Sequence, residues 1–339
     1  MIPLPMSPAI LSRASRTRRL MTSAALALAA ALGLAGTSTM AAKLTLAIAD
    51  LPAFTPALIA EAEGYYAAEG LDLKIIHCVN GRRCLKHLTD GEADAATVAD
   101  TPMVFAAHAG ARFEILGTIT TSREHRLVAR ADRGVRSLAD LKGRRLGLLQ
   151  GTSAHYFADT VLFLGRFDPD SVTRVPVPPG EVIEQLLAGE IDAAGLYQPL
   201  AQEAIRRLGT RGVVLADARY YAATMNLVGR VEPPLADEDV ARLLRALRRA
   251  CAFIQEQPAR AQAHLARQLK LDPALVDALW PDYGFRVGLA QSLVTTLESE
   301  SRWALREGLV PPGPMPDYLA RVRPGPLRSI DRRAVNIVH

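Results

Sequence analysis

The chain has 339 residues, of which 49% are hydrophobic, 22% charged and 5% aromatic, and its formal net charge is +5. This length supports one large or two medium globular domains, and ordinary Gly and Pro contents exclude a collagen-like chain. Residues 1–42 contain no acid and four of the positive charges: Arg13, Arg16, Arg18 and Arg19. No basic patch with interleaved aromatic residues follows, so the charge does not indicate a nucleic-acid-binding protein.

Residues 1–42 have the order of an export signal. The basic segment SRASRTRR precedes the apolar run LMTSAALALAAALGLAG, and the small residues STMAA follow. A membrane anchor is the alternative, but the run is short for a span of ~20 residues and rich in small side chains. We therefore expect cleavage near Ala41 or Ala42 and a soluble periplasmic protein, exported by the general secretory or the twin-arginine route.

Strands and helices alternate along the first two thirds of the remaining chain. Thr55-Pro56 and Thr101-Pro102 each predict a helix start, with a capping hydroxyl and a proline at the first helical position. This alternation predicts open α/β sheets covered by helices on both faces. From about residue 235 the chain is predicted to be helical, and its proline-rich tail is expected to lie against a lobe. The predicted strands are 44–49, 71–76, 93–98, 113–119, 144–149, 172–177, 192–196 and 212–217.

One phrase occurs twice. Residues 91–96 read GEADAA and residues 189–194 read GEIDAA, each after a short apolar helical stretch. Gly91 and Gly189 suit left-handed helix caps. Asp94 and Asp192 are interpreted as structural residues that hold backbone amides near strand starts. The repeat predicts two similar lobes.

Four segments occur in a fixed order: DLPAFTPALIAEAEGYYAAEGLDLKII, GEADAATVADTP, SLADLKGRRLGLLQGTS and GEIDAAGLYQPL. As an ordered set over about residues 43–335 they resemble the nitrate/sulfonate/taurine substrate-binding proteins of ABC transporters, whose fold is shared with binders of thiamine-pyrimidine precursors. The resemblance implies an α/β, two-lobed periplasmic-binding-protein fold of type II. Two open parallel-type sheets with flanking helices are joined by two crossover strands, and the lobes close on the ligand by hinge motion.

This fold divides the chain into segments. We place the crossovers near residues 125–131 and 226–231. The segments are then a signal peptide (1–42), the first part of lobe 1 (43–127), lobe 2 (128–228), and a return to lobe 1 with the helical C-terminal region and tail (229–339).

The resemblance implies the exported solute-binding component of an ABC importer, which delivers a small anionic or polar heterocyclic ligand to permease subunits. A periplasmic sensor-input protein is one alternative. Another is an enzyme of the same fold that builds a pyrimidine from pyridoxal phosphate, although the Cys-rich run of those enzymes is not found. The sequence also contains no GxSxG, HExxH or P-loop motif. We expect a monomer without catalytic activity or cofactor.

Ligands of open α/β sheets bind beyond the carboxyl ends of the strands, where helix N-termini offer unpaired amides. In the pair Thr152-Ser153, each hydroxyl either caps the helix that follows or contacts the ligand. In the segment YQP (197–199), the ring of Tyr197 either packs between the lobes or stacks on the ligand. Relatives place a Gly-Ser/Thr pair against the ligand and often have Trp-Glu-Pro where this chain has YQP. The candidate ligand-binding residues are Asp50, Leu51, Pro52, Phe54, Arg82, Arg83, Asp100, Thr101, Gly151, Thr152, Ser153, His155, Tyr156, Tyr197 and Gln198.

The segment HCVNGRRC contains Cys78 and Cys84. In an exported protein such a closely spaced pair favours a disulfide over two free thiols. The bond would hold Arg82 and Arg83 at the cleft mouth, where a guanidinium pairs with an anion or stays solvated. Cys251 is interpreted as a buried small apolar residue. The cysteine pair with the neighbouring histidine is an incomplete set for a tetrahedral metal, so no metal site is expected.

Overall fold

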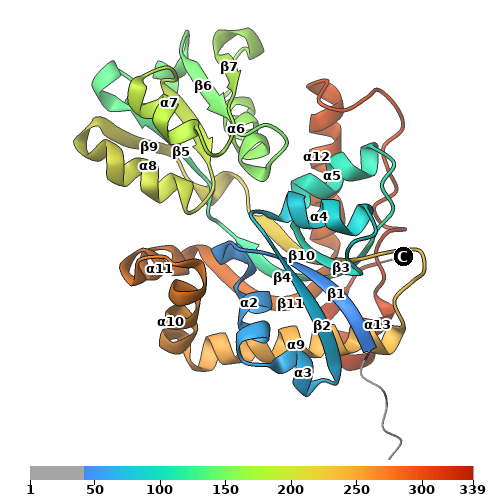
Figure 1. Cartoon of the computed structure of the whole chain (residues 1–339). Helices are drawn as coiled ribbons and strands as arrows, with labels where there is room; N and C mark the ends of the chain where they lie inside the picture. Colours follow the sequence, from blue (N-terminus) through green and yellow to red (C-terminus); the bar gives the residue numbers. More distant parts are fainter. Residues whose placement is uncertain (1–41, 339) are drawn as a thin grey trace, which may run out of the picture. The chain divides into compact units, whose positions relative to one another are not determined.

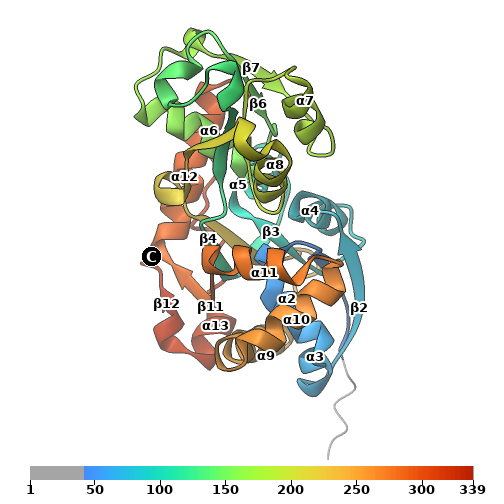
Figure 2. The ribbon, with the colours of Figure 1, turned by 90° about the vertical axis from the view of Figure 1, so that its left-hand side faces the viewer.

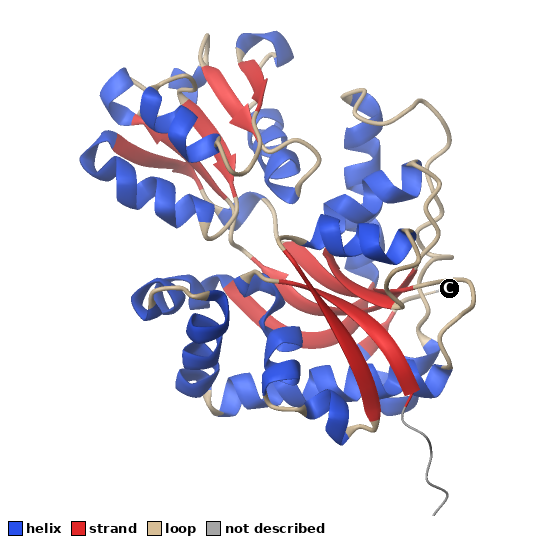
Figure 3. Cartoon of the chain, viewed as in Figure 1, coloured by secondary structure: helices blue, strands red, loops and turns tan. Residues whose placement is uncertain are grey.

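Residues 42–338 are described by a computed structural model, in which two β-sheets are flanked by helices (Figures 1 and 3). The predicted signal peptide lies, apart from its last residue, outside the described residues. Within residues 42–338 no helix combines the length and the apolar character that a membrane span needs.

The larger sheet has the strand order β12-β11-β4-β10-β3-β1-β2 and is called the large sheet. Strands β1, β2 and β3 are parallel, whereas β10 is antiparallel to both β3 and β4. The strands are β1 (Ala42–Ala49), β2 (Leu71–Cys78), β3 (Ala95–Ala99), β4 (Glu114–Ser122), β10 (Ala223–Gly229), β11 (Tyr283–Ala290) and β12 (Val335–Asn336).

The second sheet, called the small sheet, has the order β7-β6-β8-β5-β9. Strands β6, β7 and β8 are parallel, and β5 is antiparallel to β8 and β9. The α/β class and the two open sheets are confirmed, and each sheet is mixed. The strands are β5 (Arg126–Arg130), β6 (Arg145–Leu148), β7 (Thr173–Pro176), β8 (Ala193–Leu196) and β9 (Gly212–Ala216).

The chain passes between the sheets at residues 123–125 and again at residues 217–222. The second crossover was predicted near residues 226–231, and this prediction is wrong. Strand β10 pairs with β3 on one side and β4 on the other, so the predicted end of lobe 2 at residue 228 falls inside the large sheet. Strand β10 is buried almost throughout, and an apolar central strand carries no sequence signal of the sheet to which it belongs.

Helices α6, α7 and α8 lie beside the small sheet, while α2, α9 and α10 lie beside the large sheet (Figure 1). Helix α12 extends toward α6 (Figure 2), where Trp303 Nε1 donates to Asp159 Oδ2 at 2.9 Å. The helices are α2 (Thr55–Ala62), α3 (Tyr65–Ala68), α4 (Gly81–Thr89), α5 (Asp100–His108), α6 (Ser153–Leu164), α7 (Val182–Ala188), α8 (Leu200–Leu208), α9 (Asp237–Glu256), α10 (Pro258–Leu269), α11 (Pro273–Leu279), α12 (Gln291–Arg306) and α13 (Gly325–Ile330).

The region after residue 235 is not wholly helical, because β11 interrupts it and pairs with β4. Its segment YGFRVGLA alternates between exposed and buried positions, but its two glycines weaken the strand signal in the sequence. The tail packs against the large sheet, as predicted. Arg323 Nη1 bonds Glu114 Oε2 at 2.9 Å, and Ile115 forms a bridge with Val322.

The repeated phrase performs the same task in both sheets. Asp94 N donates to Thr45 O at 2.8 Å and Asp94 Oδ2 accepts from Thr45 N at 2.7 Å. Asp192 makes the same two bonds with Arg145, at 2.8 and 3.0 Å. The preceding Gly91 and Gly189 both have positive φ, of 77° and 76°. The structural interpretation of both aspartates is therefore confirmed.

Replacing Asp192 by Ala should lower the free energy of unfolding by about 2–3 kcal/mol. Its side chain is only 7% exposed and also accepts from the guanidinium of Arg145. The change therefore leaves the Arg145 amide without its acceptor, and the guanidinium without its counter-charge. Asp94→Ala is the matched comparison and should cost less, because that carboxylate is 21% exposed. Chemical denaturation measures both, and equal or absent losses would contradict the expectation.

Candidate functional site

A cavity of about 170 Å³ is lined by segments from both sheets. It lies at the carboxyl ends of β1, β2, β3, β6 and β8, where an open α/β sheet binds ligands. Its lining is largely apolar, with a few polar groups. The lining residues are Leu51, Ala53, Phe54, Asn80, Gly81, Arg82, Ala99, Pro102, Glu124, Gln150, Thr152, Ser153, Pro179, Tyr197 and Met225.

The start of helix α4 forms one wall of the cavity. Asn80 caps the helix, because its Oδ1 accepts from Arg83 N at 2.9 Å. A Cβ at Gly81 would lie 2.9 Å from the Cα of Val98, so only glycine lets the helix start approach β3 so closely. The residues of this turn that line the cavity are Asn80, Gly81 and Arg82.

Arg82 is exposed, and among residues 42–338 no carboxylate forms an ion pair with it. Its Nη1 lies 3.4 Å from the place that a Cβ at Gly151 would occupy, so the side chain lies against the turn before α6. Gly151 has a φ of 73°, which favours glycine there. A guanidinium without a partner beside two helix starts is a favourable place for an anion.

The start of helix α6 forms another wall. Thr152 is the N-cap residue, but its side chain does not cap the helix; its Oγ1 donates to Leu149 O at 2.7 Å. Ser153 Oγ lies 2.9 Å from Nε2 of the buried His125. Both hydroxyls thus have protein partners, and both residues line the cavity.

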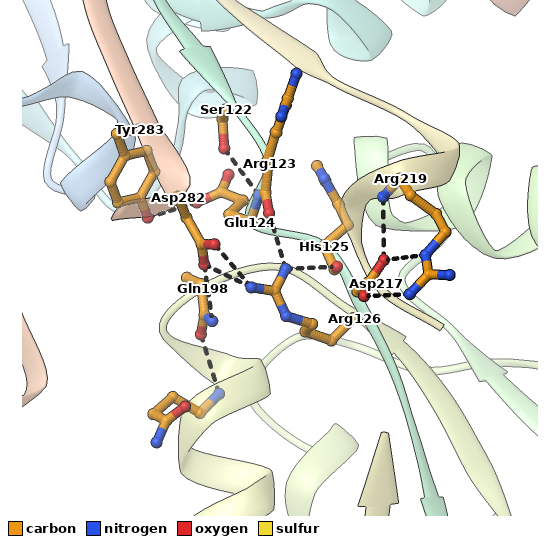
Figure 4. A network of polar contacts seen from close by, with 11 residues as sticks. Ser122, Arg123, Glu124, His125, Arg126, Gln198, Asp217, Arg219, Asp282 and Tyr283 are labelled. Carbon is orange, nitrogen blue, oxygen red and sulfur yellow. Dashed lines mark hydrogen bonds and ion pairs between the residues drawn. The ribbon is translucent and has the colours of Figure 1, made fainter. Parts of the chain in front are cut away.

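Glu124 also lines the cavity, although the sequence analysis did not predict it as a site residue. It lies in the first crossover, is 4% exposed, and accepts from the hydroxyl of Tyr283 at 2.7 Å (Figure 4). Burial raises the pKa of Glu124 to about 8, and the hydrogen bond from Tyr283 opposes this rise. The segment REHR before β5 carries no motif, so only its place in the crossover identifies the residue.

Tyr197 also lines the cavity and is half-buried. Burial, together with the charge of Glu124, raises the pKa of Tyr197 to about 12, so its hydroxyl stays protonated at neutral pH. The neighbouring Gln198 is not among the lining residues. Its Oε1 accepts from Gln202 N at 3.0 Å, and its Nε2 lies 3.5 Å from Asp282 Oδ2.

Asp100 and Thr101 form a buried cluster and are not brought to the cavity. Asp100 Oδ1 accepts from the Tyr221 hydroxyl at 2.6 Å, and its Oδ2 accepts from Thr224 N at 2.8 Å. Thr101 Oγ1 donates to Glu300 Oε1 at 3.0 Å. The oxygens of both residues therefore bond to protein groups.

The other predicted site residues do not line the cavity. Pro52 is buried in a single turn before α2, and Arg83 follows Arg82 on the exposed side of α4. Asp50 Oδ1 bonds His77 Nδ1 at 2.7 Å. His155 and Tyr156 pack edge-on against Trp303. The predicted residues that do line the cavity are Leu51, Phe54, Arg82, Thr152, Ser153 and Tyr197.

The predicted disulfide is wrong, because Cys78 and Cys84 are both free and buried. Hydrogen bonding between the two thiols lowers the pKa of Cys78, and burial raises that of Cys84. The spacing of cysteines in a sequence does not report the Cβ geometry that a disulfide requires. Cys251 is buried, as predicted. Among the described residues, no three Asp, Glu, His or Cys side chains gather as they would around a metal.

Comparison with known proteins agrees with the predicted fold. The chain is 28% identical over 153 residues to a putative binding protein of Brucella abortus, and this match covers 45% of the chain and 47% of the relative. The chain thus spans about half the length of the curated relatives it matches.

Two solved structures share the fold. One is the periplasmic aliphatic sulphonate binding protein SsuA from Escherichia coli, with a TM-score of 0.72 at 16% identity. The other is the alkanesulfonate-binding protein SsuA from Xanthomonas axonopodis pv. citri bound to MOPS, with a TM-score of 0.71 at 19% identity. Each comparison covers 84% of this chain and 99% of the other. Residues 51–261, more than half of the sequence, match the family described as NMT1/THI5 like, and the chain belongs to this family.

Proposed function

We propose that the protein is the exported solute-binding component of an ABC importer. It captures a small anionic or polar heterocyclic solute in the cavity between the two sheets and delivers it to permease subunits. The observation that carries the proposal is the cavity itself, at the carboxyl ends of strands from both sheets. It is lined by Arg82, which forms no ion pair within the part of the chain that the structure describes. The sulfonate-binding proteins that share the fold support the same role.

The anion preference rests on the two cavity walls formed by the starts of α4 and α6, and on Arg82. Residues at the starts of α4 and α6 line the cavity, and the positive end of a helix dipole favours an anion beside it. Arg82 adds a guanidinium that matches the oxygens of a carboxylate, sulfonate or phosphate. Around these groups we propose ligand contacts by Leu51, Phe54, Arg82, Thr152, Ser153 and Tyr197.

Capture requires that the ligand bind one arrangement of the two sheets more tightly than the others. The crossovers at 123–125 and 217–222 are the connections about which such a hinge would move. We further propose that the leader is removed near Ala41 or Ala42 and that the mature protein acts in the periplasm as a monomer, without catalysis.

Arg82→Ala should weaken binding of the anionic solute about 10- to 100-fold, because it removes the charged partner of the ligand's acidic group. Arg83→Ala is the matched control, since it removes an equal charge from the next position of α4, outside the cavity. A thermal-shift screen of sulfonates, nitrate, carboxylates and thiamine precursors finds the ligand. Titration calorimetry then compares the two variants.

Two results would count against the proposal. One is a screen in which no solute raises the melting temperature of the wild-type protein. The other is a ligand whose affinity falls equally in both variants, which would assign the effect to overall charge instead of the cavity.

A further inference from the structure

His125 is a fully buried residue of the first crossover (Figure 4). Its Nε2 lies 2.9 Å from the hydroxyl oxygen of Ser153, which lines the cavity at the start of α6. Its ring packs against two aromatic rings, with centroid distances of 5.5 Å to Phe157 of α6 and 5.2 Å to Tyr221 of the second crossover. The residue therefore contacts the cavity wall and the second crossover while it belongs to the first.

The imidazole of His125 is neutral. Burial, and next the positive charge of Arg126, lower the pKa of His125 to about 3. A neutral imidazole carries one N–H, so one ring nitrogen donates a hydrogen bond and the other accepts one. Within the described part of the chain, no group bonds the buried Nδ1. The adjacent hydroxyl of Tyr221 is already engaged, because it bonds two carboxyl groups.

The proton between His125 and Ser153 has two arrangements, and they differ in what they leave unpaired. If Ser153 donated to Nε2, the ring proton would lie on Nδ1, and a buried N–H would have no acceptor. If Nε2–H donates to the Ser153 oxygen, Nδ1 keeps only a lone pair. Buried N–H groups without an acceptor are rarer in proteins than incompletely used acceptors, so the second arrangement is favoured.

Resting on the proposed function, we propose that His125 is a positioning residue that fixes Ser153 as a hydrogen-bond donor to the solute. The His125 Nε2–H donates to Ser153 Oγ, so the hydroxyl proton of Ser153 is left for an oxygen of the solute. The guanidinium of Arg82 in the same lining favours the same group, an oxyanion. In the opposite arrangement Ser153 would offer the solute only lone pairs, which repel an oxyanion. One proton thus decides the selectivity of this wall.

This arrangement also links the cavity to the proposed hinge. Phe157 follows Ser153 by one turn of α6, so the hydrogen bond and the ring contact join α6 to the first crossover at two neighbouring points. The orientation of the hydroxyl that meets the solute is therefore maintained by a residue of the hinge itself.

The protonated ring nitrogen is measured directly by long-range proton–nitrogen NMR spectra of the mature protein with isotope-labelled histidine. Protonated and bare imidazole nitrogens resonate in separate regions, and the signals of His125 are those that disappear in His125→Phe. We expect the neutral form with its proton on Nε2. A proton on Nδ1 overturns the proposal, whether or not a solute has been found.

Titration calorimetry with propanesulfonate and butyrate as probes tests the consequence for binding. Ser153→Ala should weaken binding about tenfold, because a hydrogen bond to a charged group is lost. His125→Phe keeps an aromatic ring but cannot donate, and it should weaken binding about threefold or more. The double variant should bind no more weakly than Ser153→Ala alone, since both changes act through one hydroxyl.

Two further variants separate this role from a general effect on the fold. His125→Gln can donate from its amide nitrogen in place of Nε2–H, so its affinity should lie closer to the wild type than that of His125→Phe. Thr152→Ala is the matched comparison, because Thr152 lines the same wall and bonds Leu149 O instead of His125. Its loss and that of His125→Phe should multiply. Circular dichroism checks the fold of every variant.

The outcomes distinguish the positioning role from the proposed function. Unchanged affinity in His125→Phe, or losses that multiply between His125→Phe and Ser153→Ala, overturn the role of His125 while the anion-binding function stands. If the wild type binds neither probe, the same variants are compared with the solute that the wider screen identifies. A wild type that binds no solute of the screen overturns the proposed function and the positioning role together.

Discussion

Asp100→Ala is expected to lower the free energy of unfolding by about 3–5 kcal/mol. The residue is fully buried, and its carboxylate accepts from the hydroxyl of Tyr221, the backbone amide of Thr224 and the hydroxyl of Thr224. Alanine leaves the amide and the hydroxyl of Thr224 without this acceptor, and the Tyr221 hydroxyl keeps only Glu300 Oε1. Each donor left without an acceptor costs about 1–3 kcal/mol. Chemical denaturation followed by circular dichroism measures the loss.

The hydrogen-bond partners of Asp100 lie far from it in the sequence, so its loss weakens contacts between distant segments. Tyr221 lies in the second crossover, and Thr224 lies on β10 directly after it. Asp100 therefore ties the crossover to the start of α5. Asp90→Ala is the control, because that exposed carboxylate only pairs with Lys86 on the same helix and should contribute about 0.5 kcal/mol or less. If Asp100→Ala instead weakened ligand binding and left stability unchanged, the residue would belong to the ligand site.

Glu300→Gln is expected to make the protein more stable than the wild type at alkaline pH, by up to about 1.4 kcal/mol for each pH unit between 5 and the folded pKa of Glu300. Glu300 is fully buried, and its Oε1 lies 2.9 Å from the Tyr221 hydroxyl, which also lies 2.6 Å from Asp100 Oδ1. Tyr221 has one proton to donate, so both contacts are favourable only when a carboxyl of the pair carries a proton. The introduced amide can supply that donor without a charge.

The direction of this pH dependence is set by the difference between the pKa of Glu300 in the folded and in the unfolded chain. In the unfolded chain Glu300 titrates near its ordinary pKa of 4.5, whereas burial, and next the charge of Asp100, raise its pKa well above this in the folded protein. Between these values the folded state holds one proton more, so stability is fully present below pH 4.5 and is lost as pH rises toward the folded pKa. Glu124 acts in the same direction up to about pH 8, and its contribution remains in the variant.

Melting temperatures between pH 5 and pH 9 measure the effect. Glu298→Gln is the matched control on the same helix, where the carboxylate is 36% exposed and pairs with Arg302 at 3.8 Å, and it should run parallel to the wild type. If the melting temperature of Glu300→Gln also runs parallel to that of the wild type across this pH range, Glu300 is ionised in the folded protein throughout it, and the expectation is wrong.

The local pattern of the sequence was sufficient to predict the strands and the equivalent positions of the repeated phrase. Strands such as 44–49 and 212–217 are short apolar runs, and the structure places β1 and β9 there with shifts of two residues or fewer. The GExDAA phrases identified equivalent positions because the glycine conformation and the aspartate bonds depend on the residues of the phrase and one neighbouring strand start.

Side-chain roles were harder to predict, because they depend on contacts far along the chain. Asp100 follows a strand end, as a ligand residue would, yet its partners lie more than 100 residues away at Tyr221 and Thr224. Glu124 carried no motif, and its burial results from packing beside Tyr283. The cysteine pair had a suitable spacing, but both thiols are free, because spacing along the chain does not fix the geometry that a disulfide requires.

The sequence by itself determined the α/β class, the existence of two sheets, the duplicated phrase and the cavity wall at Arg82, Thr152 and Ser153. These features follow from periodicity and turn chemistry, which act over a few residues. Only the tertiary structure decided the sheet to which β10 belongs, the buried Asp100–Glu300 pair and the entry of Glu124 into the cavity. Burial and pairing of polar groups are set by elements distant in the chain, and no short pattern encodes them.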